Sequence, residues 1–120
     1  MVDSKSITRG QIYLATLVGM GSEQRGKRPV VIVQNDTGNL HSATTLVVPI
    51  TSTLKKSHLP IHVVLENKHL HKNSMALLEQ IQVVDKTRLR KKIGRLSKNE
   101  IEKIDKALAI SLDIECTGKR

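Results

Sequence analysis

The chain has 120 residues, of which 20 are Lys or Arg and 11 are Asp or Glu, so its formal net charge is +9. This length allows one domain with a modest core, so we expect a larger binding site to require a second copy of the chain. A positive excess of this size favours a polyanionic partner, such as RNA, DNA or an acidic protein segment. A solvated basic surface without a partner is the alternative.

Aromatic and cysteine residues are almost absent. Tyr13 is the single aromatic residue, which excludes the stacked-aromatic platforms of many single-strand-binding proteins, so any base recognition must use hydrogen bonds. The lone Cys116 excludes an internal disulfide and a cysteine-rich zinc site, and it fits a reducing compartment. The first ten residues lack the apolar stretch of a signal peptide, and no apolar run approaches the ~18 residues of a membrane span. We therefore expect a soluble, cytoplasmic protein with no membrane association.

Short runs of Val, Ile and Leu, bounded by Gly, Asn, Pro or charged residues, predict strands rather than helices. The runs VVIV at 30–33 and LVVPI at 46–50 are typical of strands covered on both faces. Pro49 should lie at a strand end or edge, because proline cannot donate to a ladder. The segment DTGN at 36–39 predicts a turn that makes the second and third strands a long-looped hairpin. The predicted strands lie near 10–18, 28–35, 44–50, 61–65, 74–84 and 91–96.

One helix is predicted to begin at SKNE, 97–100, where Ser97 and Glu100 have the spacing of a capping box. Several short strands followed by one helix predict a mainly β fold, a small twisted barrel with a helical lid. The folded domain should span 8–114, with flexible ends at 1–7 and 115–120. Apolar residues at three- and four-residue intervals should form the core face of the helix: Ile101, Ile104, Leu108 and Leu112.

Two charged segments could carry chemistry. The basic run 85–98 could line a phosphate-binding groove or form a solvated rim, and alternation along a strand lets only part of it face one ligand. His69 and His71 would share a face of an extended segment, but no carboxylate or cysteine flanks them at ligand spacing, so we expect no metal site. Glycine patterns of nucleotide-binding loops and the G-x-S-x-G motif are absent, and we expect no cofactor.

Arginine and hydroxyl groups remain as candidate chemical groups. Arg28 stands between the polar segment 21–27 and a buried-looking strand, and Pro29 after it restricts its backbone toward extended geometry. The segment PITST places Thr51 and Ser52 just after a buried strand, where loops commonly display functional groups. An ordinary polar strand end is the alternative interpretation of that second segment.

The chain resembles the MazF/PemK family of toxin endoribonucleases, most closely its Gram-positive MazF type, over about residues 9–114. The matching stretches are RGQIYLATL, GSEQRGKRPVVIVQNDTGN, VVPITS, LPIHVVL, NSMALLEQIQVVDKTRL and KKIGRLS. The resemblance implies a compact SH3-like barrel of the PemK/CcdB type, a symmetric homodimer, and sequence-specific, metal-independent cleavage of single-stranded mRNA. It also implies an acidic, MazE-like antitoxin that occupies the RNA groove.

The catalytic pair of the family falls on Arg28 and Thr51. In such a reaction the RNA 2'-OH is the nucleophile, and the products are a 2',3'-cyclic phosphate and a 5'-OH. A guanidinium fork fits the oxygens of a dianionic phosphorane, and a threonine hydroxyl adds a directional hydrogen bond. Glu23 is a candidate general base, although an ion pair that only orders its loop explains this residue equally well.

Amide and hydroxyl side chains can pair with exposed base edges without stacking. Leu59 could pack beneath a base, and His62 is either an RNA contact, a base or a satisfied structural histidine. A non-catalytic RNA-binding module or a gyrase poison similar to CcdB is the alternative function, although the short, polar segment DIECTGKR argues against the gyrase poison. The residues predicted to read bases are Ser22, Gln24, Ser52, Ser74 and Gln80.

Overall fold

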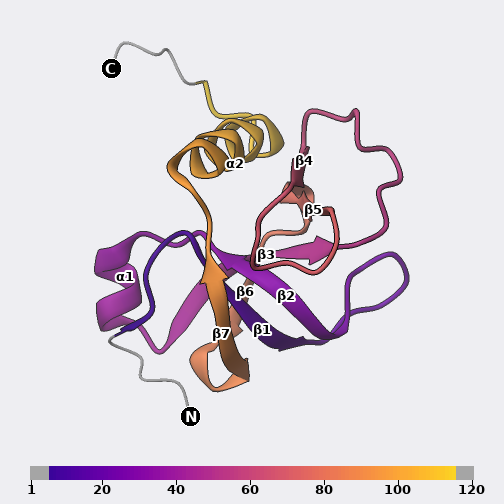
Figure 1. Cartoon of the computed structure of the whole chain (residues 1–120). Coiled ribbons are helices and arrows are strands. Elements are labelled where there is room, and N and C mark those ends of the chain that lie inside the picture. The colour runs from indigo at the N-terminus through magenta and orange to yellow at the C-terminus, as the bar shows by residue number, and fades with distance from the viewer. Residues whose placement is uncertain (1–5, 116–120) are drawn as a thin grey trace.

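A strongly curved antiparallel sheet with one helix across its end makes up the computed structural model, which describes residues 6–115 (Figure 1). The mainly β fold with a C-terminal helix is therefore confirmed. The elements in chain order are β1 (Gln11–Leu17), β2 (Gly26–Ile32), α1 (Asp36–His41), β3 (Thr44–Thr51), β4 (His62–Leu65), β5 (Ser74–Leu77), η2 (Leu78–Gln80), β6 (Gln82–Asp85), η3 (Lys86–Arg88), β7 (Leu89–Arg95) and α2 (Lys98–Ser111).

Strand β3 is the centre of the sheet because it has three partners. The strand order is β4-β5-β3-β2-β1-β7, and β6 also pairs with β3. On the side away from β2, the first half of β3 pairs with β6 up to Val47, and its second half pairs with β5 from Ile50 onward. Pro49 lies in the gap between these two ladders. It is inside the strand, so its predicted place at an end or edge was wrong, but the gap removes the need for a proline N–H there.

The chain carries extra residues where it passes from β5 to β6. A continuous ladder along β3 would pair Val47 with Glu79, but Val47 pairs with Gln82 instead. The three additional residues equal the length of η2, which bulges out of the ladder beside Pro49. The single strand predicted at 74–84 is therefore two strands separated by a 3-10 turn.

The buried side chains form two clusters on opposite faces of β1, β2 and β3. Ile12 and Val31 belong to the cluster that packs against α2, whereas their neighbours Tyr13 and Val30 belong to the other cluster. The prediction that the strands at 30–33 and 46–50 are covered on both faces is therefore confirmed. Ile7 is also buried, one residue before the predicted start of the domain, and Cys116 lies outside the described residues.

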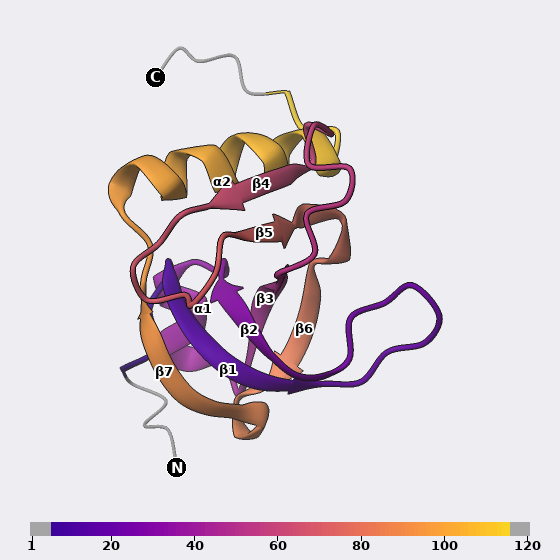
Figure 2. The same ribbon diagram turned by 45° about the vertical axis from the view of Figure 1, so that its right-hand side comes forward.

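Helix α2 begins with the predicted capping box and lies along β4 (Figure 2). The Ser97 hydroxyl accepts a hydrogen bond from the Glu100 amide at 3.1 Å, and the Glu100 carboxylate accepts one from the Ser97 amide at 2.8 Å. The core face ends earlier than predicted. Leu112 follows the last helical residue and is 48% exposed, whereas Ala107 is buried at the position that completes the face.

The connection between β2 and β3 is helical rather than a simple turn. Residues 36–41 form α1, whose first amides are capped by Asn35, which accepts a hydrogen bond from the Gly38 amide at 2.8 Å. Strands β2 and β3 still pair as the expected antiparallel hairpin. Neither helix in the described part of the chain is long and apolar enough to cross a membrane.

Candidate active site

A cavity of about 530 Å³ opens beside the start of β2 and the end of β3. This volume lies within the range of ligand-binding pockets, about 300–1,000 Å³. Of the described residues that line the cavity, five are Lys or Arg and none is Asp or Glu, so its field favours an anion. The lining residues are Leu14, Lys27, Arg28, Pro29, Ile50, Ser52, His69, Leu70, His71, Lys72, Ser74, Lys91, Lys92 and Ile93.

Arg28 is half-buried on β2 and is one of the residues that line this cavity. On the neighbouring strand β1, its pairing partner is Ala15. Its Nε donates a hydrogen bond to the Arg25 carbonyl at 3.0 Å, which fixes the guanidinium relative to the preceding loop. Within residues 6–115, no carboxylate forms an ion pair with it. The arginine is thus held by its inner nitrogen, and its two terminal nitrogens can face a phosphate.

Thr51 ends β3 next to the same cavity. It is 8% exposed, and its hydroxyl oxygen accepts a hydrogen bond from the Thr53 amide at 3.1 Å, which leaves the hydroxyl hydrogen available as a donor. Thr51 itself does not line the cavity, but its neighbours Ile50 and Ser52 do. Of the two predicted catalytic residues, Arg28 lines this cavity, whereas Thr51 stands between two lining residues of the chain and does not line it itself.

Glu23 lies elsewhere. Its exposed carboxylate accepts a hydrogen bond from the Met20 amide at 2.7 Å, within the β1–β2 loop. It lines a separate hollow with Val18 and residues 79–82. Glu23 thus contacts its own loop through a hydrogen bond, forms no ion pair within residues 6–115, and does not line the cavity of Arg28.

The predicted RNA-binding residues divide into two groups. Ser52 and Ser74 line the Arg28 cavity, and the buried Ser74 donates to the Lys72 carbonyl at 2.9 Å. Leu59 is half-buried in the β3–β4 loop outside the lining of this cavity. The other group consists of Ser22, Gln24, Gln80 and His62, whose hydrogen bonds within the protein use the backbone of Ser22 and Gln24 and the side chains of Gln80 and His62.

Gln80 bridges two residues of the β1–β2 loop. Its Oε1 accepts a hydrogen bond from the Gln24 amide at 2.9 Å, and its Nε2 donates one to the Ser22 carbonyl at 3.1 Å. The Gln24 Oε1 is buried and has no hydrogen-bond partner among the described residues. Three residues predicted to read bases therefore contact one another, and the side chains of Ser22 and Gln24 are not used in these contacts.

His62 is held between two acceptors. Its Nε2 lies 3.0 Å from a carboxylate oxygen of Glu79, and its Nδ1 lies 2.9 Å from the Lys56 carbonyl. Burial of the ring acts to lower the pKa of His62, but the hydrogen bonds to Glu79 and to the Lys56 carbonyl outweigh it, so the pKa is raised above 6.5. This environment is that of a satisfied structural histidine.

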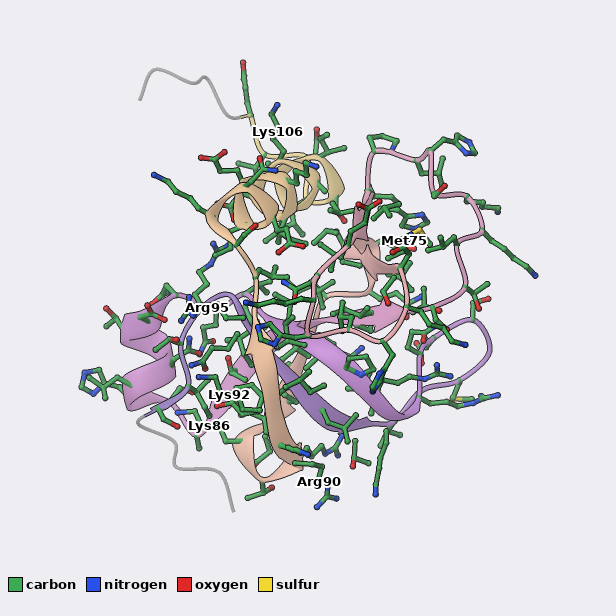
Figure 3. All side chains as sticks on the ribbon, in the orientation of Figure 1. Met75, Lys86, Arg90, Lys92, Arg95 and Lys106 are labelled. Carbon is green, nitrogen blue, oxygen red and sulfur yellow. The ribbon has the colours of Figure 1, made fainter. Side chains whose placement is uncertain are left out.

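The basic run 85–98 contributes only part of its charge to the cavity. Lys91 and Lys92 line it, whereas Arg90 donates to the Thr16 hydroxyl at 2.9 Å and Arg95 donates to the Thr8 hydroxyl at 2.7 Å. Arg90 and Arg95 lie toward opposite ends of β7 (Figure 3). Simple alternation would separate Lys91 from Lys92, but the pairing of β7 with β1 shifts register on both sides of these two lysines.

Two histidines were not predicted at this site. His69 and His71 both line the Arg28 cavity from the β4–β5 loop. A Cβ on Gly94 of β7 would lie 2.2 Å from the ring carbon Cγ of His69. The imidazole can therefore pack against β7 only because residue 94 is a glycine. Among the described residues no group of three or more His, Cys, Asp or Glu could hold a metal ion.

The family model for the PemK-like, MazF-like toxin of type II toxin–antitoxin systems matches residues 8–112. The chain belongs to this family. Solved structures agree with the MazF-like assignment. A mycobacterial endoribonuclease has a TM-score of 0.78 and 25% sequence identity, and the match covers 92% of this chain and 95% of that one. A mycobacterial endoribonuclease in complex with its cognate antitoxin has a TM-score of 0.77 and 26% identity, with coverage of 92% and 99%.

The Mycobacterium tuberculosis toxin MazF-mt6 shares the fold, with a TM-score of 0.76 and 22% identity over 88% of this chain and 99% of that one. The MazF-like barrel predicted from the sequence is thereby confirmed.

Proposed function

We propose that this MazF-like toxin is a sequence-specific endoribonuclease that cleaves single-stranded mRNA without a metal ion. The observation that carries the proposal is the Arg28 cavity, which combines five cationic side chains with no carboxylate and lies beside the end of β3, where Thr51 stands. A phosphodiester is the anion that family membership suggests, because similar structures include mycobacterial endoribonucleases.

The reaction would proceed by attack of the RNA 2'-oxygen on the adjacent phosphorus. The 2'-hydroxyl loses its proton, the bond from phosphorus to the 5'-oxygen breaks, and that oxygen gains a proton. The products are a 2',3'-cyclic phosphate and a 5'-OH end. Arg28 and Thr51 would donate hydrogen bonds to the non-bridging oxygens as their negative charge grows. Glu23 would serve as general base only if the β1–β2 loop moved its carboxylate toward Arg28.

The partners of the toxin follow from the same surface. We infer that an acidic antitoxin covers the cationic cavity and excludes RNA, because charge complementarity favours rapid capture of an acidic segment. One of the similar mycobacterial structures is a complex with a cognate antitoxin. A cytoplasmic homodimer that binds single-stranded RNA is the form in which we expect the toxin to act.

Single-turnover cleavage of a labelled single-stranded RNA at saturating enzyme, in EDTA, tests the function. Arg28→Ala and Thr51→Ala should keep the fold by circular dichroism and lower the rate on the order of a hundredfold each. Arg28→Lys should recover little, because lysine lacks the two-pronged donor geometry. The matched control is Arg88→Ala, an exposed arginine of η3 outside the cavity. RNA that binds but is never cut would show a binding module, and parental cleavage by folded Arg28→Ala would refute the assigned role of Arg28.

A further inference from the structure

The 3-10 turn η2 contacts both loops that adjoin the proposed catalytic residues. The turn bulges out of the β3 ladder beside Pro49, so its residues do not take part in the regular sheet pairing. Glu79 and Gln80 are adjacent on this turn, yet the Gln80 side chain binds the β1–β2 loop and the Glu79 side chain binds His62, the first residue of β4. The Leu78 amide also donates to the Ile61 carbonyl at 3.0 Å, at the end of the β3–β4 loop.

The first connection runs from Gln80 to Arg28. The Gln80 amide group binds the backbone of Ser22 and Gln24, with distances of 3.1 and 2.9 Å. The next residue, Arg25, supplies the carbonyl that accepts the hydrogen bond from Arg28 Nε at 3.0 Å. A side chain on η2 therefore fixes the backbone immediately before the group that orients the guanidinium.

The second connection runs from Glu79 toward Thr51. Glu79 binds His62 Nε2 at 3.0 Å, and His62 Nδ1 binds the Lys56 carbonyl at 2.9 Å, in the middle of the β3–β4 loop. The same carbonyl accepts a hydrogen bond from the Leu59 amide at 3.1 Å, which closes a turn. This loop starts directly after Thr51, so the His62 contact limits the positions available to the threonine end of the loop.

We propose that η2 is a positioning element of the RNA-cleaving site, in which Gln80 sets Arg28 through the β1–β2 loop and Glu79 with His62 sets the loop after Thr51. This inference rests on the proposed endoribonuclease function. It gives Gln80 and His62 a role that acts through the two loops instead of through direct contact with RNA. Both loops are tied to one three-residue turn, so a change at η2 affects both sides of the Arg28 cavity.

The His62 connection depends on the charge of the imidazole. Both of its acceptors need an N–H, and only the protonated ring has two. The charged groups around the ring are Glu79 on η2, Lys56 on the β3–β4 loop, and Lys103 and Lys106 on α2, which line the groove beside it. Deprotonation removes one of the two hydrogen bonds that the ring donates, so the β3–β4 loop should loosen as the pH rises.

Gln80→Met tests the first connection, because it keeps the side-chain length and removes both hydrogen bonds. In the RNA-free protein, amide hydrogen exchange of Gln24 should accelerate about tenfold, and single-turnover cleavage should fall about tenfold with RNA affinity nearly unchanged. Gln80→Glu keeps the acceptor for the Gln24 amide, so it should retain slow exchange there and much of the rate. The matched control is Asn99→Met, an exposed amide on the first turn of α2.

The outcomes separate the alternatives. If Gln80→Met weakens RNA binding while Gln24 exchange stays parental, Gln80 is a direct RNA contact and the proposal is overturned. If exchange accelerates but a folded variant cleaves at the parental rate, η2 orders the loop without positioning Arg28, which also overturns it. A parent protein that does not cleave RNA refutes the proposed function, and the exchange experiment then still reports whether η2 holds the loop.

Glu79→Gln and His62→Gln test the second connection in the same assays. The parent should show weaker protection from exchange across residues 53–59, relative to the intrinsic exchange rate at each pH, and slower cleavage as the pH rises from 6 to 8.5, a range that includes the usual histidine transition. His62→Gln should remove this pH step. The control for Glu79→Gln is Glu66→Gln, an exposed carboxylate of the β4–β5 loop. A parental pH profile in folded His62→Gln would overturn the role of this connection.

Discussion

His62 is a residue whose charge state is coupled to the stability of the described fold. Burial lowers its pKa, but the hydrogen bonds to Glu79 and the Lys56 carbonyl raise it more, so the folded-state pKa lies above the ordinary 6.5. A raised pKa means that the folded state binds the proton more tightly than the unfolded state. The stabilisation is complete below about pH 6.5 and is lost as the pH rises through the folded-state pKa.

We therefore predict that His62→Gln changes how stability depends on pH. The urea midpoint of the parent should decrease between pH 6 and pH 8.5, and the variant should show a smaller decrease over the same range. Equilibrium urea unfolding at several pH values measures this difference. The exposed His41→Gln is the control, and equal pH dependence in parent and His62→Gln would contradict the assignment.

Gly94 should not tolerate a side chain. A Cβ there would lie 2.2 Å from the Cγ and 2.6 Å from the Cβ of His69, so the β4–β5 loop must move. Gly94→Ala should lower the free energy of unfolding by about 1–3 kcal/mol, the usual cost of overpacking. Urea unfolding of Gly94→Ala, His69→Gly and the double variant tests the contact, because the double variant should recover part of the loss. Strictly additive losses would show that the two residues do not collide.

Parts of the candidate site could be predicted where a residue is marked by the residues next to it in the sequence. Arg28 beside Pro29 and Thr51 near the end of a buried strand could be identified from the sequence, and the structure places Arg28 in the cavity lining and Thr51 at the end of β3 between two lining residues. The contact of His69 with Gly94 joins segments far apart in the chain, so no local pattern indicates it. The bond from Gln80 to the β1–β2 loop was missed for the same reason.

At the scale of elements, the start of α2 joins two parts of the fold. Glu100 accepts hydrogen bonds from the Ser97 amide and from the Asn67 side chain, both at 2.8 Å. Asn67 also donates to the Arg95 carbonyl at 3.1 Å, which ties the β4–β5 loop to the end of β7. The capping box therefore anchors the loop that carries His69 and His71.

Substitution of the two capping-box residues should destabilise the protein by different amounts. Ser97→Ala should destabilise the protein by about 1 kcal/mol, the usual value for an N-cap, and Glu100→Ala should cost more because it also releases Asn67. Asn99→Ala, an exposed residue in the same turn, is the control. Urea unfolding provides the values. A smaller effect for Glu100→Ala than for Ser97→Ala would show that Asn67 does not depend on Glu100.

Most elements were predictable because each is specified by a local pattern. Apolar runs identified the strands, and Ser97 with Glu100 identified the start of α2. The break at η2 was not predictable, since its cause is the pairing of β3 with two different strands on one side. Leu112 continues the helical period in the sequence, but the helix ends before it, at Ser111.

For the molecule as a whole, the net charge of +9 should act mainly on RNA binding. Lys91 and Lys92 line the Arg28 cavity and carry charge without the fork geometry of arginine. Lys91→Ala should weaken RNA binding and reduce the slope of log affinity against log salt by about one, with little effect on the single-turnover rate. Binding titrations from low to high salt measure the slope. An unchanged slope would place Lys91 outside the RNA path.

Self-association is the second prediction at this scale. A chain of 120 residues has little room for both a core and a long RNA groove, so we expect a symmetric homodimer. Sedimentation of the purified toxin at concentrations from nanomolar to micromolar, with cleavage assayed in parallel, tests this expectation. A stable monomer with full activity at nanomolar concentration would contradict it.

The pairing of β7 with β1 has a consequence during protein synthesis. Arg28 and Thr51 belong to the first half of the chain, whereas Lys91, Lys92 and Ile93, which line the same cavity, belong to the last strand. A nascent chain that has not yet emerged from the ribosome through β7 therefore contains the proposed catalytic pair but not the complete cavity. The cavity proposed to bind RNA is therefore complete only after β7 has emerged from the ribosome and paired with β1.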